Sequence, residues 1–402
     1  MDSATVASVG WLRSLRTSSG SRDSAPAAGV ARALGSVLFV LLALVASIAS
    51  GCGRASESGK TESGKTESGT ATTPNAGTGE AGTGADGVRV VATTGLIADA
   101  ARRVAGEHAR VTALMGEGVD PHMYKASLAD VRLLNEADIV LYTGLHLEGR
   151  MQDVLGRLGE KKPVLAIAEA LPKESLRSPA EFDGQADPHV WFDAALWAGV
   201  ARPIAEMLAK VDPPRAQVFG ENAAAFEREL ASLHAWARER IATIPPERRV
   251  LVTAHDAFGY FGRAYGLEVL GVQGISTDSE ASIRDIAALV DTLVSRRVPA
   301  VFVESSVSRK TIDALVEGCA ARGHNVVVGG ELFSDALGPD GTPEGTYVGM
   351  FRHNVRTIVQ ALGGALDEST GNEGTAPVGT SLSAPAEAPV ATSPGGSGSG
   401  AP

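Results

Sequence analysis

The chain has 402 residues, of which 44% are hydrophobic and 5% aromatic, and its formal net charge is −11. This length accommodates two ordinary domains with a substantial core. The acidic balance argues against nucleic-acid binding, which depends on clustered cations.

The N-terminal segment, residues 1–51, has the three parts of a secretory signal. An arginine-bearing start is followed by an apolar stretch at 33–48 and by small residues directly before Cys52. This order resembles a bacterial lipoprotein signal, so we expect a lipid on Cys52 to hold the protein at a membrane. The alternative is an uncleaved signal anchor, at about the lower length limit for a spanning helix. Both interpretations place the rest of the chain outside the cytoplasm, in the periplasm or at the cell surface.

Residues 52–87 form a low-complexity stretch of Gly, Ser, Thr, Glu and Lys with almost no apolar side chains. Such a composition cannot bury enough surface to fold, so we expect a flexible tether with a reach of about 30 Å. Its short repeat produces the phosphate-loop pattern at 59–66. That loop works only between a buried strand and a helix start, and neither flank is expected here, so the sequence predicts no nucleotide binding.

Strands alternate with helices from residue 88 onward, which indicates a parallel, doubly wound α/β lobe over 88–192. The strands are expected at 88–94, 111–115, 139–142 and 164–168, and the helices at 97–105, 128–137 and 149–158. A loop-like polar stretch at 172–186 follows this alternation.

A linking helical segment is expected at 193–246. Asp193 is placed to cap a helix that runs to residue 210, and Pro213 and Pro214 stop it. A second, long helix is predicted at 215–242, because apolar residues recur on one stripe. The members of this stripe are Phe219, Phe226, Leu230, Leu233 and Ala237.

The α/β alternation restarts in a second lobe at 247–366. Strands are expected at 250–253, 267–272, 301–303 and 326–328, and helices at 258–265, 283–296, 311–322 and 347–362. Cys319 falls on one of these helices and, with Cys52 lipidated, has no disulfide partner, so a small buried residue is expected there. The tail at 367–402 is rich in Gly, Ala, Pro, Ser and Thr and is expected to be disordered.

Four polar side chains in the folded part have the character of metal ligands. They are His122 and His189, each preceded by Asp-Pro, together with His255 and Asp335. Neutral imidazole and carboxylate groups without sulfur suit zinc, manganese or iron. The positions match no local ligand motif, so only a fold that gathers strand ends could bring them together. Taken singly, each histidine is more simply explained as a hydrogen-bonded structural residue.

Other polar residues are candidates for supporting roles. His146 is the best candidate for a spare ligand, although a place in the cleft wall or at a helix start is favoured. Asp256 is a hypothetical partner that would orient an imidazole. The remaining histidines have the positions of surface or packing residues, and they are His108, His234, His324 and His353.

Five sequence stretches together resemble the metal-binding class of solute-binding lipoproteins of ABC transporters, the zinc and manganese receptors. They are VDPHMY at 119–124, DPHVW at 187–191, AHDAFGYF at 254–261, GIST at 274–277 and GELFSD at 330–335. The resemblance covers about 88–366 and implies two α/β lobes joined by one long, rigid backbone helix, with one metal ion at their interface. It also implies that His122 and His189 are ligands from the first lobe, and that His255 and Asp335 are ligands from the second.

The function implied by this resemblance is capture and not catalysis. The chain is expected to be a monomeric, extracytoplasmic receptor that takes zinc or manganese and delivers the ion to an ABC-type permease. Histidine at the third ligand position accompanies zinc or mixed binding in this class, so His255 favours zinc. No histidine-rich loop, common in dedicated zinc receptors, occurs at 172–186, so manganese stays an alternative. Binding should weaken below about pH 6, as the histidines protonate near their usual pKa of about 6.5.

Two other functions fit parts of the pattern. A metallohydrolase would keep a coordination position open for water, and Glu304 or Glu331 could supply the general base beside it. No His-Glu-x-x-His element occurs in the sequence, however, and four protein ligands leave little need for water. An acidic, exposed lipoprotein could also act as a surface adhesin. We therefore expect a receptor and not an enzyme.

Overall fold

The computed structural model describes residues 87–182 and 184–366. The predicted signal at 1–51, the predicted lipidation site Cys52, the expected tether up to residue 86 and the expected tail from 367 lie outside this range. Within the described residues, no helix has both the length and the apolar character that a membrane span requires.

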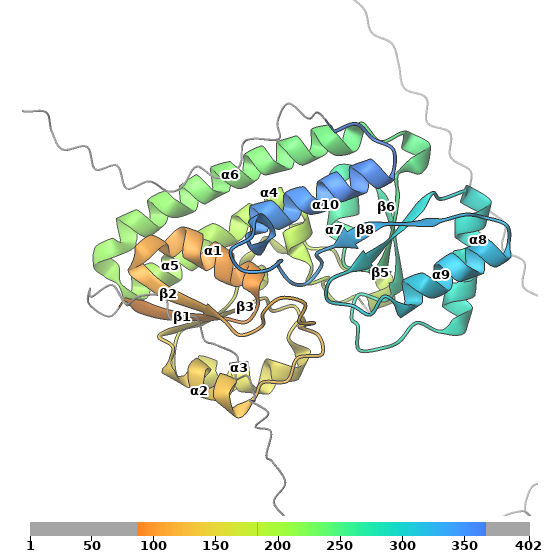
Figure 1. Cartoon of the computed structure of the whole chain (residues 1–402). Helices are drawn as coiled ribbons and strands as arrows, with labels where there is room; N and C mark the ends of the chain where they lie inside the picture. Colours follow the sequence, from red (N-terminus) through yellow and green to blue (C-terminus); the bar gives the residue numbers. More distant parts are fainter. Residues whose placement is uncertain (1–86, 183, 367–402) are drawn as a thin grey trace, which may run out of the picture. The chain divides into compact units, whose positions relative to one another are not determined.

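The first lobe is built on a parallel sheet with the strand order β2-β1-β3-β4 (Figure 1). Alternate residues of a strand face opposite layers. Val90 packs with the core that includes α1, whereas Val91 packs with the core that includes α2 and α3. Helices on both faces of a parallel sheet confirm the predicted doubly wound class. The elements are β1 (Val88–Ala92), α1 (Gly95–Ala105), β2 (Ala109–Ala113), α2 (Leu128–Glu136), β3 (Ile139–Tyr142), α3 (Gln152–Gly159) and β4 (Val164–Ala166).

The second lobe repeats this arrangement with two strand pairs, β5-β6 and β7-β8, in which β5 lies beside β7. Val252 packs with α8 and α9 on one face, while Phe302 packs on the other face in the core that includes α10. Cys319 of α9 is a free, buried cysteine, as predicted. The elements are β5 (Val250–His255), α7 (Gly259–Tyr265), β6 (Glu268–Gln273), α8 (Ile283–Arg296), β7 (Ala300–Glu304), α9 (Lys310–Ala321), β8 (Val327–Leu332) and α10 (Tyr347–Ala361).

The long helix α6 (Ala216–Ala242) packs against elements of both lobes (Figure 1). It contacts α1 and α5 (Ala201–Val211) beside the first sheet, and α7 and α10 beside the second. One apolar stripe of α6 is buried in a core that is continuous from α1 to α10. The buried residues are Phe219, Ala223, Phe226, Leu230, Leu233, Ala237 and Ile241, which include all five that the periodicity indicated.

The helix predicted from Asp193 to residue 210 is interrupted. Asp193 caps α4 (Ala194–Trp197) by accepting two backbone N–H bonds, as expected, but a 3₁₀ turn at Ala198–Val200 separates α4 from α5. The physical reason is Pro203, which has no N–H and clashes with the preceding turn inside a helix. Because α5 restarts at Ala201, Pro203 falls in the first turn, where it is tolerated.

Strand β8 is longer than predicted, because it continues through Gly329 and Gly330. A Cβ atom at position 329 would lie 2.7 Å from Cβ of Ala361 and 2.9 Å from Cε1 of Phe302. Glycine in this strand therefore marks a close approach of the backbone to α10 and β7, and not the end of the strand. This extension brings the chain to Asp335.

Candidate metal centre

The four predicted ligands come together from four different parts of the fold. His122 lies in the loop between β2 and α2, and His189 directly precedes the 3₁₀ turn at Val190–Phe192. His255 is the last residue of β5, and Asp335 follows the end of β8. Their side chains are almost completely buried, with exposed fractions between 0% and 3%. One donor atom from each lies within 4.8 Å of all the others, so the cluster could hold one metal ion.

Three of the separations between donor atoms are close to those of a tetrahedral centre. Nε2 of His189 lies 3.3 Å from Nε2 of His122 and 3.5 Å from Oδ1 of Asp335, and Nε2 of His255 lies 3.4 Å from Oδ2 of Asp335. In a tetrahedral site with bonds of about 2.0–2.1 Å, neighbouring donors lie about 3.3–3.4 Å apart. Nε2 of His255 and Oδ1 of Asp335 are also buried without a hydrogen-bond partner. A cation bound among these atoms would satisfy both.

Both Asp-Pro-His stretches use the same local structure to present their histidine. Oδ1 of Asp120 accepts the backbone N–H of His122 at 2.9 Å, and Oδ1 of Asp187 accepts that of His189 at 3.0 Å. Such a bond from an aspartate to the residue two positions on stabilises a tight turn. In the first stretch, the hydroxyl of Thr277 also donates to Oδ2 of Asp120 at 2.6 Å. The second lobe therefore helps to hold the turn that carries His122.

Buried carboxylates orient two of the three imidazoles. Nδ1 of His189 lies 2.8 Å from Oδ1 of Asp187, and Nδ1 of His255 lies 2.6 Å from Oε2 of Glu304. Since an ionised carboxylate only accepts hydrogen bonds, each Nδ1 carries the proton and each Nε2 lone pair is left for the metal. Among the described residues, Asp187 and Glu304 fill the role that the sequence analysis gave to Asp256, so that prediction was wrong.

Asp187 and Glu304 differ in whether the sequence alone could have identified them as partners of the histidines. Asp187 is visible in the sequence because it stands two positions before His189 in a repeated phrase. Glu304 is contributed by β7, at 49 positions from His255, and it also accepts the backbone N–H of His255 at 2.8 Å. No local spacing could have identified it, because only the neighbouring positions of β5 and β7 in the sheet bring the two residues together.

Burial and neighbouring charges shift the pKa values of the clustered side chains in directions that favour cation binding. Burial lowers the pKa of His122 to about 3, so this ring is neutral. Burial also opposes protonation of His255, but the carboxylates of Glu304 and Asp335 outweigh it and raise the pKa well above the ordinary value. Burial would raise the pKa of Asp335, but the facing histidines, above all His255, lower it instead. These carboxylates therefore favour positive charge at the cluster, whether as a proton on a histidine or as a bound cation.

The other histidines lie outside the cluster. His146 is exposed, and its Nδ1 lies 2.6 Å from Nε2 of Gln152, so the structure does not bring this spare candidate to the centre. His234 contacts the Tyr265 hydroxyl, and Nε2 of His324 contacts the Val298 carbonyl. These contacts agree with the predicted packing roles.

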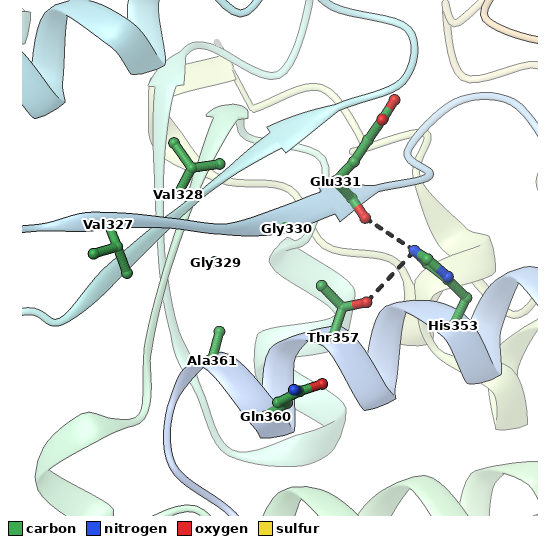
Figure 2. Close-up of a pocket in the computed structure, with 9 residues that line it drawn as sticks. All are labelled: Val327, Val328, Gly329, Gly330, Glu331, His353, Thr357, Gln360 and Ala361. Carbon is green, nitrogen blue, oxygen red and sulfur yellow. Dashed lines mark hydrogen bonds between the residues drawn. The ribbon is translucent and has the colours of Figure 1, made fainter.

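Neither of the two carboxylates that could act as the general base of a hydrolase, Glu304 and Glu331, is free beside the cluster. Both oxygens of Glu304 are taken by His255. Glu331 lies at a separate surface hollow of about 450 Å³ between β8 and α10 (Figure 2). Its side chain points away from His353, whose Nε2 lies 3.0 Å from the Glu331 carbonyl oxygen (Figure 2). Neither residue is placed as a free general base beside the cluster.

Comparison with known proteins assigns the chain to a family. The model of the family described as ZnuA, zinc-uptake complex component A, periplasmic, matches residues 90–361. The chain is 54% identical over 275 residues to the manganese-binding lipoprotein MntA of Bacillus subtilis (strain 168), covering 68% of this chain and 90% of that protein. It is 48% identical over 279 residues to the zinc-binding protein TroA of Treponema pallidum (strain Nichols), covering 69% and 90%.

Solved structures agree with this assignment. The periplasmic zinc-binding protein TroA from Treponema pallidum superposes with a TM-score of 0.67 at 48% identity, covering 69% of this chain and 99% of that chain. Fe(III)-bound YtgA from Chlamydia trachomatis superposes with a TM-score of 0.62 at 28% identity, covering 70% and 100%. The matched region contains the two lobes and all four clustered side chains, and the chain belongs to the family of periplasmic zinc-uptake complex component A.

Proposed function

We propose that the protein is an extracytoplasmic receptor that captures one zinc or manganese ion between its lobes and delivers it to an ABC-type permease. His122, His189, His255 and Asp335 serve as the ligands. The ion is cargo, and the role of the chain is to bind and release it. The observation that carries the proposal is the cluster of four buried donor atoms within 4.8 Å of one another.

Zinc is the ion that the geometry favours. Three donor separations of 3.3–3.5 Å are close to those of a tetrahedral centre, which zinc prefers, and imidazole is a good zinc ligand. Manganese stays the second candidate, because one similar relative is named a manganese-binding lipoprotein and another a zinc-binding protein. The two ions are separated by direct competition for the same site.

We place the receptor at a membrane, attached through a lipid on Cys52 and a tether up to residue 87. The relative MntA is itself named a lipoprotein, which supports this arrangement. Domain limits of 88–192, 193–246 and 247–366 for the first lobe, linking segment and second lobe belong to the same proposal. The receptor acts as a monomer that presents the loaded lobes to the permease.

The proposal is tested by measuring bound metal in protein purified without chelator. Mass spectrometry should find one equivalent of zinc or manganese in the wild type and a reduced amount in both His189→Ala and Asp335→Ala. His146→Ala, which changes an exposed histidine outside the cluster, is the matched control and should retain the metal. A wild type that stays free of metal after addition of both ions would refute the proposal.

A further inference from the structure

Arg177 contacts Asp187, the carboxylate that holds His189, and is not itself a member of the cluster. Its Nη1 donates to Oδ2 of Asp187 at 2.5 Å, while Oδ1 of the same carboxylate holds the ring and the backbone N–H of His189. The Asp187 side chain is 0% exposed, whereas that of Arg177 is 22% exposed. A buried carboxylate is costly unless it is paired. The guanidinium supplies this pairing at the oxygen that His189 leaves free.

The space for the guanidinium depends on Gly259, the first residue of α7. A Cβ atom at this position would lie 1.3 Å from Nη1 and 2.2 Å from Cζ of Arg177. No side chain therefore fits at position 259 while Arg177 holds Asp187. The glycine is explained by the guanidinium that occupies its side-chain space.

Tyr260, the next residue of α7, fixes the same segment. Its hydroxyl donates to the carbonyl of Asp187 at 2.9 Å and accepts the backbone N–H of Arg177 at 3.0 Å. Cζ of Arg177 lies 5.7 Å from the centre of the Tyr260 ring, within the range of a cation–π contact. Since α7 closely follows His255 in the chain, the segment that carries Arg177 is tied to the surroundings of two ligands.

We propose that Arg177 is a positioning residue for metal capture. It fixes Asp187, and through Asp187 it fixes Nε2 of His189 relative to α7 and His255. The inference rests on the proposed metal-binding function. Loss of a residue that holds the metal ligands in place without binding the metal typically lowers metal affinity by about 10–100-fold. We expect a loss in this range for Arg177→Ala.

A double-mutant cycle between Arg177 and Gly259 tests the inference. Zinc affinity is measured by chelator competition for the wild type, Arg177→Ala, Gly259→Ala and the double variant. Gly259→Ala alone should weaken binding, because its methyl group displaces the guanidinium. In the Arg177→Ala background the same change should cost nothing, because the space is empty. Additive losses would overturn the inference. If Gly259→Ala fails to fold, recovery of a cooperative thermal transition in the double variant supports it, and failure of the double variant as well overturns it.

Chemical rescue gives a readout that a general structural role would not produce. Millimolar guanidinium chloride should restore zinc affinity to Arg177→Ala, whereas sodium chloride at equal ionic strength should not. The visible spectrum of the Co²⁺-loaded variant should change in the same way, being altered by Arg177→Ala and restored by guanidinium. Arg263→Ala is the matched control, because Arg263 also lies over Tyr260 but donates to the carbonyl of Ser175.

The outcomes separate this inference from the proposed function. Unchanged affinity in Arg177→Ala, or a loss that guanidinium does not reverse, would overturn the positioning role while leaving metal capture intact. An equal loss in Arg263→Ala would also overturn it. Absence of binding of both zinc and manganese by the wild type would overturn both proposals.

Discussion

Replacement of Glu304 by glutamine should switch the tautomer of His255. The carboxylate accepts two hydrogen bonds from this residue, one from the backbone N–H at 2.8 Å and one from Nδ1 at 2.6 Å. A glutamine has one acceptor oxygen and one donor NH₂ group. The backbone N–H requires the oxygen, so the NH₂ group faces Nδ1, which must then give up its proton. The ring proton moves to Nε2, the atom that would bind the metal.

The expected loss of zinc affinity has two causes, the change of tautomer at His255 and the removal of the buried negative charge of Glu304. Changes to residues that hydrogen-bond to a metal ligand lower metal affinity by about 10–100-fold, or about 1.4–2.7 kcal/mol. We therefore expect Glu304→Gln to bind zinc at least about tenfold more weakly in chelator competition at pH 7.5. Glu331→Gln removes the same charge from an exposed position and should match the wild type. Affinity within about twofold of the wild type in Glu304→Gln would refute the reasoning, because a change of that size is less than about 0.5 kcal/mol.

Three further predictions concern pH, release and stability. Zinc affinity should fall about tenfold per pH unit as the pH drops through the raised pKa of His255, because one proton must leave before the ion binds. Because this pKa is raised, the fall should begin above pH 6.5, and not below about pH 6 as expected from the sequence. Calorimetry in buffers of different ionisation enthalpy that found no proton release would contradict this prediction. Thr277→Val should speed zinc release about tenfold in stopped-flow chelator experiments, because it leaves an oxygen of the half-buried Asp120 without its partner, and an unchanged rate would exclude this role. Phe226→Ala should lower the free energy of unfolding by about 3–5 kcal/mol in urea, and the exposed control Val218→Ala by less than about 0.5 kcal/mol. Equal effects of these two changes would show that the buried stripe of α6 does not stabilise the fold.

Local patterns were sufficient to predict most of the regular structure. The helix α8 has the predicted bounds, because Ser282 and Asp285 form a complete capping box at its start. Local patterns are a poorer guide where tertiary contacts override local preference. Periodicity predicts a helix that runs through Pro203, and two glycines predict an early end of β8, where close packing on α10 requires them instead.

The four members of the cluster were predictable from the sequence, but the residues that support them were only partly so. His122 and His189 stand in repeated phrases, and His255 ends a strand whose apolar run is clear in the sequence. Glu304 and Arg177 have no such signature. Tertiary packing brings Glu304 to His255 through the adjacency of β5 and β7, and it brings Arg177 to Asp187 beside α7.

The most direct test of the account is a crystal structure of the zinc-loaded protein with anomalous data collected on both sides of the zinc absorption edge. The account predicts one anomalous peak bonded to Nε2 of His122, His189 and His255 and to the carboxylate of Asp335. A peak elsewhere, or a fully occupied ion that leaves any of these four side chains unbound, would contradict it.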